Sequence, residues 1–190
     1  MASGSTMCGP ACAGLCADGT VYSWRMPTTQ RRGPGSGYRR LRLRRTDGRV
    51  YLDRWGVSAD RIGGVYLHRM TAPDPGLDLH DHPWTFVTVP LWGGYLEERA
   101  ATNEASELAE HAERLGIECR GMSGVVRPFR PRRMRLDECH RIIRLNRRTA
   151  WTVVFRGPRR RKWGFYTPTG FEESQAAASA RRPLFEEGVG

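Results

Sequence analysis

Between about residues 38 and 168, apolar residues recur in short runs that glycine, proline and charged residues separate. Several of these runs alternate apolar and polar positions, which is the pattern of a β-strand with one buried face. We expect strands at 41–44, 50–52, 65–68, 84–92, 95–98, 124–127, 140–145, 151–155 and 163–166. Asp47-Gly48 predicts a hairpin turn between the first two. Many short strands separated by turn residues favour an all-β barrel or sandwich.

A single segment within this region has helical periodicity. Ala105, Leu108, Ala112 and Leu115 fall on one face of a helix, and charged residues occupy most of the opposite face. Gly116 follows directly and is a suitable C-terminal stop. We therefore expect one short helix in an otherwise β-rich domain.

The composition divides the chain into three parts. Residues 1–37 are rich in Gly, Pro, Ser, Thr and Arg, which predicts an N-terminal arm or tail with at most a short strand at 21–24. Residues 38–170 form the expected β-barrel domain. Residues 171–190 are expected to be a C-terminal tail that holds a short helix or is disordered.

The N-terminal arm contains three cysteines at a regular spacing. Cys8, Cys12 and Cys16 would bring three sulfur atoms together in a helix or a loop. No fourth ligand is evident, and Gly9-Pro10 opposes a stable helix. A metal-binding role and a flexible tail therefore both stay open for this segment.

The 190-residue chain carries a formal net charge of +11. Only one of its 31 basic residues, Lys162, is a lysine, and coding bias explains this better than a phosphate-binding surface does. Arginine clusters at 39–45, 130–135 and 159–162 nevertheless predict weak, non-specific nucleic-acid affinity. No helix-turn-helix, zinc-finger or RNA-binding motif is present.

The chain has no apolar run of the roughly 18 residues that a membrane helix needs. It also lacks a signal peptide pattern at its N-terminus. We therefore expect a cytoplasmic protein that makes no membrane contact.

Two histidines, His80 and His82, stand two positions apart at the start of the apolar run 84–92. Residues i and i+2 of a strand point to the same face, so both imidazoles would converge on one point. His140 begins another expected strand far downstream. Neutral imidazoles are common transition-metal ligands, and the three histidines therefore predict a metal site. The alternative is a metal-free barrel in which these histidines serve structure alone.

The pattern His80-x-His82, Gly94 and a later His140 resembles the cupin superfamily of metal-binding proteins. The longer string of YLHRM, LHDHPW, GGY and GPRRRKWGF also resembles small cupin-like proteins encoded by actinobacteria and their phages. The resemblance covers roughly residues 51–168. It implies a cupin-type jelly-roll β-barrel, with the one short helix between the two metal motifs and flexible termini.

The chain departs from the cupin pattern at its carboxylate ligand. Counting three or four residues beyond His82 places Phe86 or Val87 where the family has a glutamate. The second motif is weaker still, because His140 and Asn146 come later than the family's spacing. A site with three histidines and no glutamate is similar to that of the thiol dioxygenases, which use iron.

This resemblance implies an iron-dependent oxygenase that acts on a small anionic molecule. Fe(II) is the expected metal, with Zn, Mn or Ni as alternatives. Three neutral imidazoles leave positions open for O₂ and for a substrate whose charge offsets that of the metal. Metal-assisted isomerisation is an alternative reaction on the same scaffold. The alternative function is a non-catalytic barrel that binds a ligand or nucleic acid, with a structural metal or none, and a homodimer is a further expectation.

Four other residues are candidates for substrate contacts or catalysis. Tyr66 and His68 lie on the strand before the histidine pair and alternate with Met70. Tyr95 and Glu97 lie on the return strand, and Glu97 is also an alternative metal ligand. Burial in the core is an equally good explanation for His68.

Three further residues bear on the site. Trp84 and Phe86 share the parity of the two histidines and either line the cavity or belong to the plain core. Cys139 has the opposite parity to its neighbour His140, so we expect it to point away from the metal.

Overall fold

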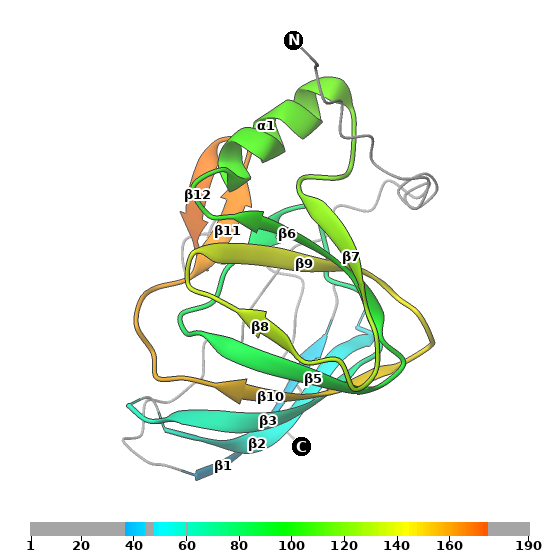
Figure 1. The fold of residues 1–190 in the computed structure, drawn as a ribbon, viewed down its shortest axis with the longest axis vertical. Coiled ribbons are helices and arrows are strands. Elements are labelled where there is room, and N and C mark those ends of the chain that lie inside the picture. The colour runs from blue at the N-terminus through cyan, green and yellow to red at the C-terminus, as the bar shows by residue number, and fades with distance from the viewer. Residues whose placement is uncertain (1–36, 45–47, 60, 175–190) are drawn as a thin grey trace.

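The computed structural model describes residues 37–44, 48–59 and 61–174. Its strands form two antiparallel sheets that face each other, with one helix beside them (Figure 1). The first sheet has the order β1 (Gly37–Arg44), β2 (Val50–Ala59), β3 (Gly63–Met70), β10 (Ala150–Arg156), β5 (Phe86–Trp92), β8 (Arg132–Met134). The second has the order β12 (Gly170–Glu173), β11 (Gly164–Thr167), β4 (Leu79–His80), β9 (Glu138–Leu145), β6 (Tyr95–Ala101), β7 (Met122–Val126).

Each strand expected from the apolar pattern lies within or overlaps a strand of the structure. β4, β8 and β12 were not expected, and β4 and β8, with two and three residues, are too short to show a periodic pattern. Among the described strands, none pairs with a strand of the other sheet. The described fold is thus an all-β, two-sheet architecture rather than a closed barrel.

The segment around the histidine pair differs from the expected single strand. His80 ends β4 in the second sheet, whereas Phe86 begins β5 in the first. The chain therefore crosses between the sheets in the residues from Asp81 to Thr85. Within this crossing, His82 contacts His140 of the second sheet and Phe86 of the first.

The core fills the space between the inner faces of the sheets. One cluster gathers Leu52, Met70 and Ala150 of the first sheet with Tyr95 and Ile142 of the second. Alternation along β10 puts Ala150, Thr152 and Val154 on the buried face, since residues i and i+2 share a face.

A second cluster of Tyr66, Phe86, Met134 and Val154, with Trp84 packed against it, lies beside the histidines. Gly56 makes room for Tyr66, because a Cβ at that position would lie 2.7 Å from the Tyr66 Cδ1 atom.

Helix α1 (Ala105–Leu115) confirms the single helix expected from the sequence. Gly116 ends it with a left-handed backbone (φ 64°), as the sequence predicts. The buried face consists of Ala105, Ala109 and Ala112, which pack toward β11 and β12. Leu115, expected on that face, is exposed. Within the described part of the chain, no helix is long and apolar enough to cross a bilayer.

Candidate metal centre

Two neighbouring strands and one loop position the three histidines. His80 of β4 and His140 of β9 are direct partners in the antiparallel ladder of the second sheet. His82 lies in the segment that crosses to the first sheet. The crossing segment is held by Asp81, whose buried carboxylate accepts hydrogen bonds from the Gly164 amide (2.8 Å) and the Tyr166 hydroxyl (3.1 Å). Because Asp81 turns toward β11, the side chains on either side of it turn the other way.

The three imidazoles meet as the sequence predicts. The His82 and His140 Nε2 atoms lie 2.9 Å apart. The ring centroid of His80 lies 4.8 Å from that of His140 and 5.2 Å from that of His82. One ring nitrogen from each residue lies within 4.8 Å of the others, and together they form a group that could hold a metal ion.

This arrangement fits a divalent transition metal. Imidazole nitrogens bind such metals at about 2.1 Å, so two cis ligands of an octahedron lie about 3.0 Å apart. The 2.9 Å between the His82 and His140 Nε2 atoms is close to that separation, whereas the group as a whole spreads over as much as 4.8 Å, so the His80 ring has to move inward to complete the ligand set. Three nitrogen donors on one side of an ion also leave its other positions for further ligands.

Burial favours the neutral, metal-binding form of two of these histidines. It lowers the pKa of His80 to about 4, with His140 adding to the shift and nearby acids opposing it. Burial, followed by the charges of its histidine neighbours, holds the pKa of His82 well below its ordinary value. Both rings are thus neutral near pH 7 and keep a lone pair for coordination.

Glu97 orients His140 instead of joining the histidine group. Its Oε1 atom accepts a hydrogen bond from His140 Nδ1 at 2.7 Å, which leaves His140 Nε2 facing His82. Ion pairs with Arg99 (3.2 Å) and Arg132 (3.3 Å) surround the other carboxylate oxygen. A carboxylate that fixes the tautomer of a histidine ligand is a common feature of metal sites.

The ionised state of Glu97 follows from these contacts. Burial alone would raise its pKa, but the hydrogen bond from His140 and the two cations outweigh burial and lower the pKa. Glu97 thus contacts His140 and lies outside the group of three ring nitrogens, and its alternative role as a metal ligand stays a prediction.

Aromatic rings enclose the histidines. Phe86 stands edge-on to His82 with ring centroids 4.8 Å apart and lies 6.0 Å from His140. Phe165 lies 5.9 Å from His80. Phe86 therefore lines the site, whereas Trp84 packs against the core cluster beside it.

The other candidate residues fall in different places. Tyr66 and His68 face the interior next to this cluster, with ring centroids 6.0 Å apart. Tyr95 is buried in the other core cluster, among residues such as Leu52 and Met70. Cys139 packs with Leu79 and Ala105 beneath α1, which confirms that it points away from His140.

Two functional candidates, Arg54 and Arg156, were not expected from the sequence. Both are arginines whose side chains turn into the space between the sheets. Strand alternation could have predicted their inward orientation. Arg54 lies two positions after the core residue Leu52, and Arg156 lies two positions after the core residue Val154.

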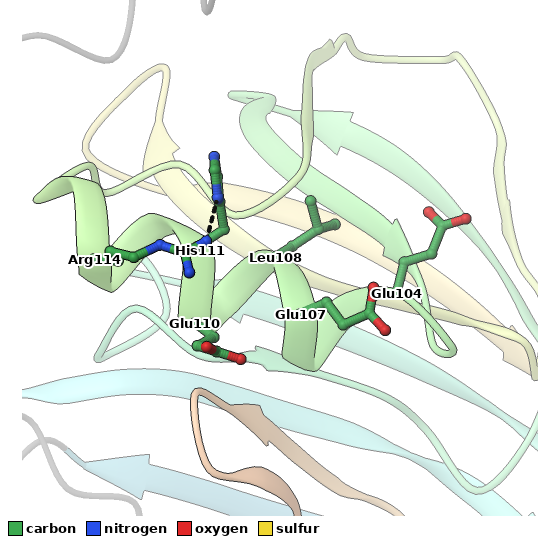
Figure 2. A pocket seen from close by; sticks show the side chains of 6 residues that line it. All are labelled: Glu104, Glu107, Leu108, Glu110, His111 and Arg114. Carbon is green, nitrogen blue, oxygen red and sulfur yellow. Dashed lines mark hydrogen bonds between the residues drawn. The ribbon is translucent and has the colours of Figure 1, made fainter.

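An open groove follows α1 on the surface (Figure 2). Glu104, Glu107 and Glu110 line it, together with Leu108 and a His111 that is hydrogen-bonded to Arg114 at 2.9 Å. His111 is exposed there. The groove lies apart from the three-histidine group and shares no residue with it.

Each of the three arginine clusters contributes an ion pair inside the fold. Arg132 reaches Glu97, and Arg161 forms an ion pair with Asp81. In the first cluster, Arg42 pairs with the buried Asp53 at 2.6 Å. Cys8, Cys12 and Cys16 lie outside the described residues, as does the segment 21–24.

No family model and no curated protein matches this chain. A two-sheet β architecture with three histidines close together is compatible with a cupin-like fold.

Proposed function

We propose that this protein is a cupin-type metalloprotein in which His80, His82 and His140 bind one divalent transition metal. The observation that supports this most strongly is the convergence of three ring nitrogens from β4, β9 and the crossing segment. The hydrogen bond from His140 to the buried Glu97 adds the carboxylate that commonly orients a histidine ligand.

We further propose that the metal is Fe(II) and that the protein is an oxygenase of a small anionic molecule. With three neutral nitrogen ligands, Fe(II) supplies open positions for O₂ and substrate together with an uncompensated positive charge. The residues of the chain orient the ligands, enclose the site with Phe86 and Phe165, and provide cationic surroundings. Glu97 is neutralised locally by Arg99 and Arg132, so its carboxylate does not cancel that charge.

Oxygen uptake tests this function. Protein reconstituted with Fe(II) under anaerobic conditions is mixed with air-saturated buffer and a panel of small thiols, carboxylates and phosphates. We expect uptake with at least one compound, and its loss in His140→Ala but not in His111→Ala, which removes the exposed histidine of α1. Uptake that is equal in both variants, or no uptake with any compound, would refute the oxygenase.

One observation favours a second candidate, a barrel-like ligand-binding protein without metal. A 2.9 Å separation between two Nε2 atoms is also a normal hydrogen bond between neutral imidazoles. In that case His82 and His140 satisfy each other, and Zn(II), Mn(II), Ni(II) and Fe(II) would all fail to bind in a calorimetric titration. Binding of any of them at one ion per chain decides for the metalloprotein.

A further inference from the structure

Two arginines occupy inward positions of the first sheet. Arg54 of β2 and Arg156 of β10 share strand parity with the core residues Leu52 and Val154. Arg156 is 6% exposed, and Arg54 is partly buried. An arginine that turns into a protein interior usually has a carboxylate or another anion that compensates its charge, and Arg54 departs from this rule.

No carboxylate of a described residue forms an ion pair with Arg54. Its Nε atom donates to His68 Nε2 at 2.8 Å, and its guanidinium lies over the Tyr66 ring, 5.0 Å from the centroid. Its two terminal nitrogens donate to no residue that the structure describes. Arg141 shows the usual arrangement, since its Nε atom pairs with the buried Glu98 at 2.6 Å. Arg54 therefore offers two hydrogen-bond donors in a fork that matches an oxyanion.

Arg156 brings a second positive charge to the same aromatic ring. Its Nε atom donates to the Tyr66 hydroxyl at 3.2 Å, and its guanidinium lies 4.4 Å from the centroid of Trp84. Burial lowers the pKa of Arg54, and the charge of Arg156 lowers it further. The two guanidinium groups lie 5.0 and 5.9 Å from the centroid of the same buried Tyr66 ring, so an anion bound at Arg54 would also be attracted by Arg156.

Phe86 and Tyr66 connect the two arginines to the three histidines. Phe86 touches the His82 ring and packs with Tyr66 in the same cluster. Phe86 is also the ladder partner of Arg156 on β10. A small molecule whose anionic end reached Arg54 would thus extend toward the histidines along the face formed by Tyr66 and Phe86.

We propose that Arg54 and Arg156 bind the oxyanion group of the substrate, a carboxylate or a phosphate, beside the three-histidine centre. Two cations favour a group with two negative charges over one with a single charge. His68 positions Arg54 by accepting the hydrogen bond from its Nε atom. The inference rests on the proposed function for the neighbouring metal, whereas the anion site itself requires no metal.

Calorimetric titration of metal-free protein with inorganic phosphate and with malonate tests the site. Malonamide, the neutral analogue of malonate, serves as the control ligand. We expect one anion per chain for at least one probe and no binding of malonamide. Preference for phosphate or malonate identifies the oxyanion. Absence of binding for both anions, or equal binding of malonamide, would overturn the proposal.

Variants connect the binding to Arg54. Losing a charge-assisted hydrogen-bonded contact weakens binding by about tenfold to a hundredfold, which we expect for Arg54→Gln. Arg144→Gln removes the same charge from an exposed position on β9 and is expected to change affinity by less than about twofold. Equal losses in both variants would indicate general charge attraction and overturn the site.

A second substitution at Arg54 shows whether a loss of anion binding comes from misfolding. Arg54→Lys keeps the charge but loses the planar fork, and we expect it to weaken anion binding by about tenfold while circular dichroism stays that of the wild type. Unchanged affinity in a folded Arg54→Lys, together with unchanged affinity in Arg54→Gln, would exclude Arg54. A metal titration on Arg54→Gln separates the two proposals, because loss of the positive charge near His82 should leave metal affinity at or above that of the wild type whether or not the anion binds.

Discussion

Glu97→Gln tests how the histidine centre is built. Glu97 is 2% exposed, and its Oε1 atom lies 2.7 Å from His140 Nδ1. Glutamine keeps the shape and one acceptor oxygen but removes the charge that favours the Nδ1–H tautomer of His140. Loss of a carboxylate partner of a histidine ligand costs about 10- to 100-fold in metal affinity, or about 1.4–2.7 kcal/mol. We expect this loss in a calorimetric titration of metal-free protein with Zn(II) or Co(II).

The neighbouring residue supplies a matched control. Glu98 is also fully buried, but it pairs with Arg141 at 2.6 Å on the other face of β6. Removing one partner of a buried ion pair costs about 3–5 kcal/mol, so both variants should lower the free energy of unfolding. Only Glu97→Gln should weaken metal binding, and Glu98→Gln should leave the affinity within about threefold of the wild type. Wild-type affinity in Glu97→Gln, or equal losses in both variants, would refute the positioning role.

Three further predictions concern pH, the helix end and a buried thiol. Burial, followed by the charge of Arg54, holds the pKa of His68 well below 6.5, so the unfolded chain binds the extra proton first as pH falls. The stability that neutral His68 contributes is therefore complete above about pH 6.5 and declines below it. In chelator-treated protein, His68→Gln should reduce the slope of the free energy of unfolding against pH by up to about 1.4 kcal/mol per pH unit. An unchanged slope would contradict this. Gly116→Ala should lower the free energy of unfolding by about 1 kcal/mol in a denaturant titration, because the φ of Gly116 is 64°. At Gly124 a Cβ also meets no atom within 4 Å, but φ is not positive, so Gly124→Ala should cost less than about half as much. Equal costs would contradict the strain argument. Burial raises the pKa of Cys139 to about 12, so peptide mapping after iodoacetamide treatment should show it alkylated only in denatured protein, and modification in the native state would contradict its placement.

Strand periodicity was sufficient to predict most of the fold, since alternation reports which face of a strand is buried. It could not predict β4, because two residues carry no period, and so it placed His80 on the same strand as Phe86. The convergence of His80 and His82 was nevertheless predicted correctly. Parity persists across the short crossing, since Asp81 is anchored on the opposite side by Gly164 and Tyr166.

The residues that contact the histidines are set by the arrangement of the strands and not by the local sequence pattern. Glu97 reaches His140 because β6 and β9 are neighbours, with a register irregularity between Leu96 and Glu97. No sequence pattern encodes that register. Arg54 was detectable in principle, because a charged residue at a core parity position is unusual. Its lack of a carboxylate partner among the described residues became apparent only when neighbouring strands were in place.

Metal content measured by inductively coupled plasma mass spectrometry tests the central claim most directly. The protein is purified without a histidine tag, reconstituted with Fe(II), Zn(II), Mn(II) or Ni(II) in turn, and freed of excess metal. We predict close to one bound ion per chain for at least one metal in the wild type and in His111→Ala. The double variant His80→Ala/His140→Ala should hold almost none. Equal metal content in the wild type and the double variant, whether high or sub-stoichiometric, would contradict a centre formed by these histidines.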